Sequence, residues 1–184
     1  KQFDMVIVIS HHTEVDIMAV VRDIKKKFPD LPLVLLCQSV MQARTCRLEG
    51  DRSSDIDRTF LWIGNTDILL ALIKGAEDRL NVAHDTRSAG IRAIIFDRHS
   101  PEYMTSLLPI LYKELVSQTQ AVMEEGLNEE HRLLAMRARP KILLAENYEE
   151  AVALYQQYEP YVLGVITDVL YPKAGRLDDQ SGIK

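Results

Sequence analysis

The sequence lacks the features that mark several large classes of protein. Only two cysteines occur among 184 residues, and the spacing of Cys37 and Cys46 fits no metal motif, so both are expected to be packing residues. No apolar run approaches the roughly 18 to 20 residues that a membrane helix requires. The lysines and arginines are dispersed and the formal net charge is −5, which disfavours nucleic acid and anionic membranes as partners.

The motifs of common enzyme sites are also missing. There is no Gly-x-Ser-x-Gly nucleophile elbow, no Walker loop and no Gly-x-Gly-x-x-Gly. His11 and His12 stand near Glu14 and Asp16, but adjacent side chains on a strand point apart, so capping or loop roles are expected rather than a metal site. No signal peptide is recognisable. These absences favour a cytoplasmic segment, and we expect it to be excised from a longer protein.

What the sequence does contain is an alternation of apolar strands and amphipathic helices. This pattern predicts an α/β protein with parallel sheets flanked by helices. The expected strands are Phe3–Ile9, Leu33–Cys37, Thr59–Ile63, Ile91–Phe96, Lys141–Ala145 and Val162–Thr167. The expected helices are Glu14–Phe28, Val40–Leu48, Ile68–Leu80, Pro101–Gln120 with a continuation to Ala138, and Tyr148–Tyr158. The polar segment 83–90 is expected to be a linker between two units, residues 1–82 and 91–184.

Two carboxylates follow strands of the second unit. Asp97 comes directly after the strand Ile91–Phe96, and Asp168 comes directly after Val162–Thr167. The carboxyl ends of parallel strands lie at one edge of a sheet, and open α/β sheets bind their ligands at that edge. We therefore expect Asp97 and Asp168 to share a solvent-facing pocket.

The run from Gly164 to Pro172, together with Asp97 and the segment 145–151, resembles a two-component receiver domain over residues 91–184. The resemblance implies a flavodoxin-like, doubly wound sheet in which Asp168 accepts a phosphoryl group. It also implies that Mg²⁺ is held by Asp97, Asp168 and the backbone carbonyl of Leu170, and that the donor is a histidine kinase or phosphotransfer protein. Receivers carry two adjacent acids where this chain has Asp97-Arg98, so Arg98 is a candidate substitute for the metal's charge.

The first unit resembles the last three strands of another receiver, without its chemistry. Ile9 falls in the phosphoacceptor position, and Cys37 and Ile63 fall near the hydroxyl and lysine positions, which makes this unit a pseudo-receiver. Residues 60–82 and 125–141 resemble the tandem receiver-like region that precedes a phosphoenolpyruvate synthase-type, PEP/pyruvate-binding module. The resemblance implies two incomplete units, a missing C-terminal module as partner, and a parent phosphotransferase.

Three interpretations remain open at this point. The segment is a phosphorylated regulatory module, a non-phosphorylated pseudo-receiver that serves as a binding or dimerisation scaffold for an attached enzyme, or a small-molecule enzyme at the same sheet edge. The apolar helix Leu107–Met136 either joins the two units or serves as a contact surface for a homodimer or another partner. The residues leave open whether the chain is an enzyme, and the first interpretation is preferred because of the position of Asp168.

Overall fold

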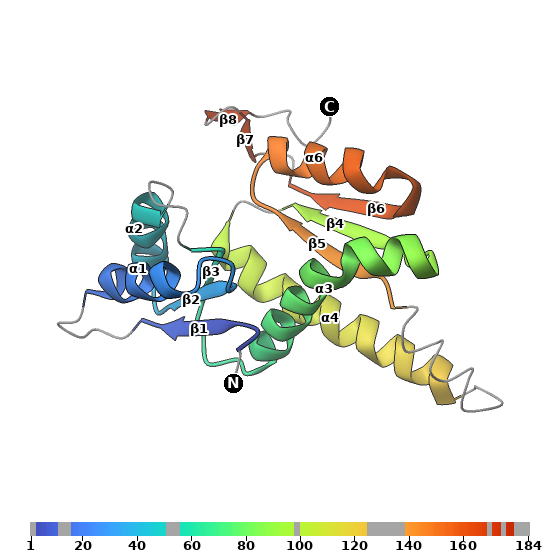
Figure 1. Cartoon of the computed structure of the whole chain (residues 1–184), viewed down its shortest axis with the longest axis horizontal. Coiled ribbons are helices and arrows are strands. Elements are labelled where there is room, and N and C mark those ends of the chain that lie inside the picture. The colour runs from blue at the N-terminus through green and yellow to red at the C-terminus, as the bar shows by residue number, and fades with distance from the viewer. Residues whose placement is uncertain are drawn as a thin grey trace.

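The computed structural model describes residues 3–10, 16–50, 56–97, 100–124 and 139–168, and the strands at 171–173 and 176–178. The described chain forms two separate three-stranded sheets with parallel strands, and a two-stranded antiparallel ribbon. The prediction of an alternating α/β fold is confirmed. Figure 1 shows helices α1 and α2 beside the N-terminal sheet and α6 beside the C-terminal sheet, with α3 and α4 between.

The N-terminal sheet has the strand order β1-β2-β3. Its elements are β1 (Val6–Ile9), α1 (Ile17–Lys27), β2 (Leu33–Cys37), α2 (Val40–Gly50) and β3 (Arg58–Leu61). All five residues of β2 are buried, because both faces of this central strand are covered. Leu35 and Cys37 pack in a core with residues of α1 and α2, whereas Val34 and Leu36 belong to the core around α3 and α4. A strand buried on both faces needs an uninterrupted apolar run, and Leu33–Cys37 provides one.

The C-terminal sheet has the order β5-β4-β6. Its elements are β4 (Ala93–Asp97), β5 (Lys141–Ala145), α6 (Tyr148–Tyr158), the single 3₁₀ turn η1 (Glu159–Tyr161) and β6 (Val162–Thr167). If β4 is counted as strand 1 of a unit, this order is 2-1-3, which is compatible with the first three strands of a flavodoxin-like sheet. The α6 residue Ala151 packs against Ile95 and Ala145 on one face of this sheet.

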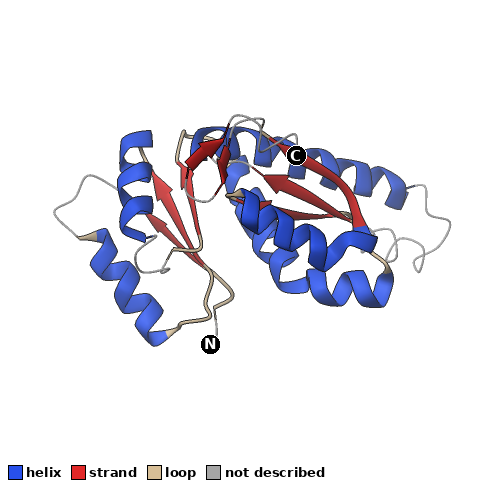
Figure 2. Cartoon of the chain, turned by 90° about the horizontal axis from the view of Figure 1, so that it is seen from above, coloured by secondary structure: helices blue, strands red, loops and turns tan. Residues whose placement is uncertain are grey.

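The two long helices belong to both halves of the molecule. They are α3 (Asp67–Ala89) and α4 (Pro101–Glu124). Figure 2 shows the two sets of strands standing apart. One buried core nevertheless includes Phe60 of the N-terminal sheet, Phe96 and Ile142 of the C-terminal sheet, and Leu72 and Leu108 of the two helices. The helices therefore join the two sheets through one shared core.

The segment expected to be a linker is helical. Helix α3 was expected to end near Leu80, but it continues to Ala89 and includes residues 83–89. Val82 and Thr86 are buried, so the packed face of the helix extends two turns beyond the expected end. The helix stops at Gly90, which takes the left-handed conformation (φ 64°), and the Gly90 and Ile91 amides donate to the Thr86 and Asp85 carbonyls.

Other boundaries differ from the expected ones in smaller ways. Strands β2 and β5, helix α6 and strand β6 have the predicted bounds, whereas β1 and β3 are shorter than expected and β4 includes Asp97. After Asp168 the described chain also contains strands β7 (Tyr171–Lys173) and β8 (Arg176–Asp178), which pair antiparallel and are not among the expected strands. The expected continuation of α4 toward Ala138 lies outside the described residues. None of the described helices has both the length and the apolar character needed to cross a bilayer.

Candidate functional site at the ends of strands β4 and β6

The structure brings the carboxyl ends of β4 and β6 side by side. Strands β4 and β6 pair in parallel, and Asp97 at the end of β4 is in register with Thr167 at the end of β6. Asp168 is the next residue after Thr167. The two acidic residues therefore lie at the ends of neighbouring strands, at one edge of the sheet. This edge is where an open α/β sheet binds ligands. The predicted roles of Asp97 and Asp168 in phosphate and metal chemistry remain predictions.

The two carboxylates occupy different environments. Asp97 is fully buried, whereas Asp168 is partly exposed. The Thr167 hydroxyl lies 3.2 Å from a carboxylate oxygen of Asp97 and 3.0 Å from the backbone carbonyl of Asp168. A hydroxyl carries one proton, so it can donate fully to only one of these oxygens at a time. The Thr167 side chain therefore connects the two strand ends. Thr167 was not among the site residues predicted from the sequence, although it directly precedes Asp168.

Among the described residues, few side chains at this edge could bind a metal ion. Mg²⁺ in proteins is usually held by one or two carboxylates together with water, so Asp97 and Asp168 fit the chemistry of such an ion. Among the described residues, no group of three or more histidine, cysteine or acidic side chains could hold a metal. Arg98 and Leu170, the other two predicted site residues, lie outside the described residues. Asp97 would have to become accessible before a hydrated ion could reach it.

The capping role expected for the polar residues near the N-terminus is confirmed for Asp16. The Asp16 carboxylate caps helix α1, accepting hydrogen bonds from the amides of Met18 (3.0 Å) and Ala19 (3.1 Å). His11, His12 and Glu14 lie outside the described residues.

The residues that the structure describes at the last positions of β1 and β2 are not the aspartate that a receiver carries at this edge. Ile9 ends β1 and Cys37 ends β2, while Ile63 follows β3 by two residues. A hydrogen bond with the Cys46 thiol and burial raise the pKa of Cys37, so this thiol stays protonated. Both cysteines are buried and free, as expected for packing residues. An isoleucine side chain cannot accept a phosphoryl group, and a buried, protonated thiol is a poor nucleophile, which fits the pseudo-receiver interpretation of the first unit.

A buried ionic cluster was not found from the sequence. Asp78 of α3 is fully buried and accepts hydrogen bonds from the Arg139 guanidinium, the Tyr112 hydroxyl (2.9 Å) and the Ile142 amide (2.9 Å). Burial and the nearby Asp78 carboxylate raise the pKa of Tyr112, which keeps its hydroxyl protonated as a donor. The Lys141 ammonium is 3.7 Å from Asp78 and 2.7 Å from Asp85. The cluster fixes α3 against the start of β5, and we assign it a structural role.

Comparison with known proteins gives no match: no family model, no curated protein and no solved structure is similar to this chain. The functional argument therefore depends on the geometry of the sheet edge and on the residues themselves.

Proposed function

We propose that this chain is a cytoplasmic regulatory module of the receiver type, in which Asp168 accepts a phosphoryl group from a histidine kinase or phosphotransfer protein. One observation carries the proposal. The strand order β5-β4-β6 is the 2-1-3 order of a flavodoxin-like sheet, and Asp97 and Asp168 follow neighbouring strands at its carboxyl edge. The partial exposure of Asp168 supports access by a phosphoryl donor.

In the proposed reaction, a carboxylate oxygen of Asp168 attacks the phosphorus atom of a phosphohistidine. The bond between phosphorus and the imidazole nitrogen breaks, the imidazole keeps the electron pair, and an acyl phosphate forms on Asp168. Bound Mg²⁺ would supply positive charge to the phosphoryl oxygens, and Asp97, Asp168 and the Leu170 carbonyl are the proposed ligands. Arg98 is the candidate for supplying that charge instead. The new phosphoryl group would carry about −1.5 to −2 charges beside these strand ends.

A second candidate function is favoured by the burial of Asp97. In this function the chain is a non-phosphorylated pseudo-receiver, a binding or dimerisation scaffold that regulates an attached PEP synthase-like phosphotransfer enzyme. A fully buried carboxylate that accepts from the Thr167 hydroxyl holds two strand ends together without any ligand. A phosphoacceptor site would require that contact to open, because Asp97 must reach solvent to bind a hydrated ion.

Incubation with acetyl phosphate and Mg²⁺ separates the two functions. Intact-mass spectrometry should show one added phosphoryl group, lost in Asp168→Asn and retained in Asp23→Asn, a matched change at an exposed position of α1. Beryllofluoride with Mg²⁺ should shift the backbone NMR signals of Asp97, Thr167 and Asp168. If neither reagent produces these changes in the folded wild-type chain, the phosphoacceptor function is wrong and the scaffold function is supported.

A further inference from the structure

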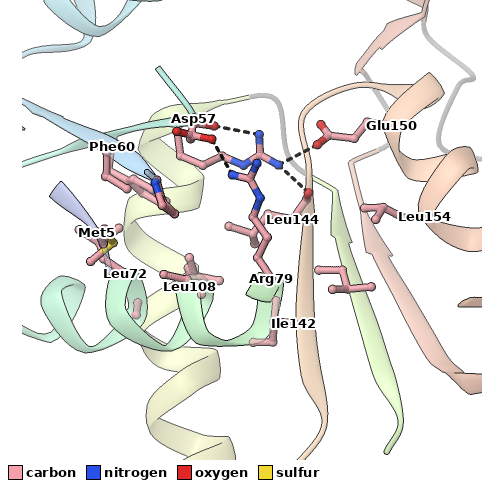
Figure 3. A pocket seen from close by; sticks show the side chains of 17 residues that line it. Met5, Asp57, Phe60, Leu72, Arg79, Leu108, Ile142, Leu144, Glu150 and Leu154 are labelled. Atoms are coloured by element: carbon pink, nitrogen blue, oxygen red, sulfur yellow. Dashed lines mark hydrogen bonds and ion pairs between the residues drawn. The ribbon is translucent and has the colours of Figure 1, made fainter. Parts of the chain in front are cut away.

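A cavity lies between the two sheets, away from the carboxyl ends of β4 and β6. Its volume is about 140 Å³. Figure 3 shows Phe60, Leu72 and Leu108 on one side of it and Ile142, Leu144 and Leu154 on the other. These walls come from β3, α3 and α4 on one side and from β5 and α6 on the other. The cavity is therefore lined by both halves of the molecule, and most of its wall is apolar.

Two small residues of α3 leave this space open. Gly75 and Ala76 both line the cavity, and each occupies a position where a leucine would extend several atoms farther from the helix. A Cβ atom added at Gly75 would meet the Tyr112 hydroxyl at 3.6 Å, an ordinary contact distance, so the lack of a side chain there is not enforced by crowding.

The charged residues at the rim of the cavity are already paired with one another. The Arg58 guanidinium donates to a Glu150 carboxylate oxygen (2.7 Å) and to the Leu144 carbonyl (2.9 Å). The Arg79 guanidinium donates to an Asp57 carboxylate oxygen (2.7 Å), as Figure 3 also shows. A charged ligand would have to compete with these intramolecular pairs. An uncharged ligand could enter the apolar space and leave them intact.

We propose that this cavity binds a small, uncharged, apolar molecule of about the size of benzene or indole. The volume supports that size, because an apolar protein cavity of about 150 Å³ holds benzene. Ligand sites in proteins are lined mainly by apolar and aromatic side chains, and most of the residues that line this cavity are of that kind. A bound molecule would contact both sheets and both long helices, and it would stabilise their arrangement. This site is separate from Asp97 and Asp168, so the proposal stands independently of the proposed function.

The direct test is a titration of the whole chain, with its methyl groups ¹³C-labelled, with benzene and, in parallel, with benzoate. Benzene should produce saturable shifts in the methyl signals of Leu72, Leu108 and Ile142, with much smaller shifts at Leu35, which packs in the separate core beneath α1 and α2. Benzoate should bind more weakly than benzene. Shifts that do not saturate, that spread equally to Leu35, or that are stronger with benzoate would each overturn the proposal.

A matched pair of variants adds a second measurement. Ala76→Leu fills the cavity from α3 and should weaken benzene binding by about tenfold or more, since a few methylene groups decide fit in an apolar pocket. Ala83→Leu makes the same change at an exposed position of the same helix and should bind benzene as the wild type does. Unchanged affinity in a folded Ala76→Leu variant would place the ligand elsewhere and overturn the proposal. The wild-type shift map decides the matter even if that variant does not fold.

Discussion

At the scale of single residues, one partly buried acid, Asp57, organises contacts between distant parts of the chain. Asp57, just before β3, accepts from the Lys25 ammonium (2.7 Å), the Leu33 amide (2.8 Å) and Arg79 (2.7 Å). Burial by itself would raise the pKa of Asp57, but these three donors outweigh it and hold that pKa below its usual value. Asp57 thereby ties α1, β2 and α3 to the start of β3.

This arrangement predicts how stability depends on pH. Because the pKa of Asp57 is lower in the folded chain, its contribution is complete above the ordinary pKa of 3.8 and is lost as the pH falls through the folded pKa. Urea unfolding measured between about pH 2 and pH 7 should show the free energy of unfolding falling on the acid side, and Asp57→Asn should make that fall shallower. Asp23→Asn, at an exposed position of α1, should leave the slope as in the wild type. An unchanged slope in Asp57→Asn would contradict the assignment.

At the scale of elements, the outer edge of β5 is covered by side chains instead of a strand. The Ile142 amide donates to Asp78 of α3, and the Leu144 carbonyl accepts from Arg58 of β3. An edge strand left with open backbone groups is a template for pairing with another chain. Burial opposes the charge on Arg58, but Glu146 and Glu150 more than offset this and raise its pKa, so it remains a cation. The Asp78 and Arg58 side chains thus bind two backbone groups at the outer edge of β5, where a further strand would otherwise pair.

The end of α3 gives a prediction at the same scale. Gly90→Ala should lower the free energy of unfolding by about 1 to 2 kcal/mol, because a left-handed backbone conformation strains any residue with a Cβ atom. No atom lies within 4 Å of the position that the new Cβ would take, so the cost comes from the backbone alone. Chemical denaturation would measure it. Ser88→Ala, exposed on the last turn of the helix, should change stability by less than about 0.5 kcal/mol, and an equal effect of both changes would be inconsistent with the αL cap.

At the scale of the whole molecule, the central core makes the two sheets interdependent. That core combines Phe60 with Phe96 and Ile142 around α3 and α4, and Trp62, the single tryptophan, packs against it. Although the described parallel strands form two separate sheets, neither of these sheets keeps this core if the other unfolds.

We therefore predict one cooperative unfolding transition. Trp62 fluorescence and far-UV circular dichroism should give coincident curves in urea, since coincidence of different probes is the test of two-state unfolding. Leu108→Ala, which removes a fully buried side chain of the central core, should shift both curves together by about 2 to 5 kcal/mol. Two separated transitions, or a shift in only one probe, would show that the two sheets unfold as independent units.

Local sequence patterns predicted much of the secondary structure, and the reasons are visible in particular elements. Leu33–Cys37 is apolar throughout because both of its faces are buried, and Asn147 marks the start of α6 because its side chain accepts from the Glu150 amide (2.8 Å). The extension of α3 past Asn81 could not be predicted in this way. It depends on the burial of Val82, which packs in one cluster with Leu143 and Tyr158 from remote parts of the chain.

The candidate site, too, could be predicted from the sequence only in part. The positions of Asp97 and Asp168 after apolar strands were enough to predict that both follow strands of one sheet. The pairing of Asp97 with Thr167, and the complete burial of the Asp97 carboxylate, required the strands to be assembled.

The sequence by itself determined where apolar strands and amphipathic helices alternate, and hence that the chain forms parallel α/β sheets. That information is local, because the period of apolar residues selects helix or strand within a few turns. Only the tertiary structure decided that Asp78 and Arg58 cover the edge of β5, that α3 and α4 serve both sheets, and that a cavity remains between them. Those features come from contacts between residues up to 92 positions apart, such as Arg58 with Glu150, which no local pattern encodes.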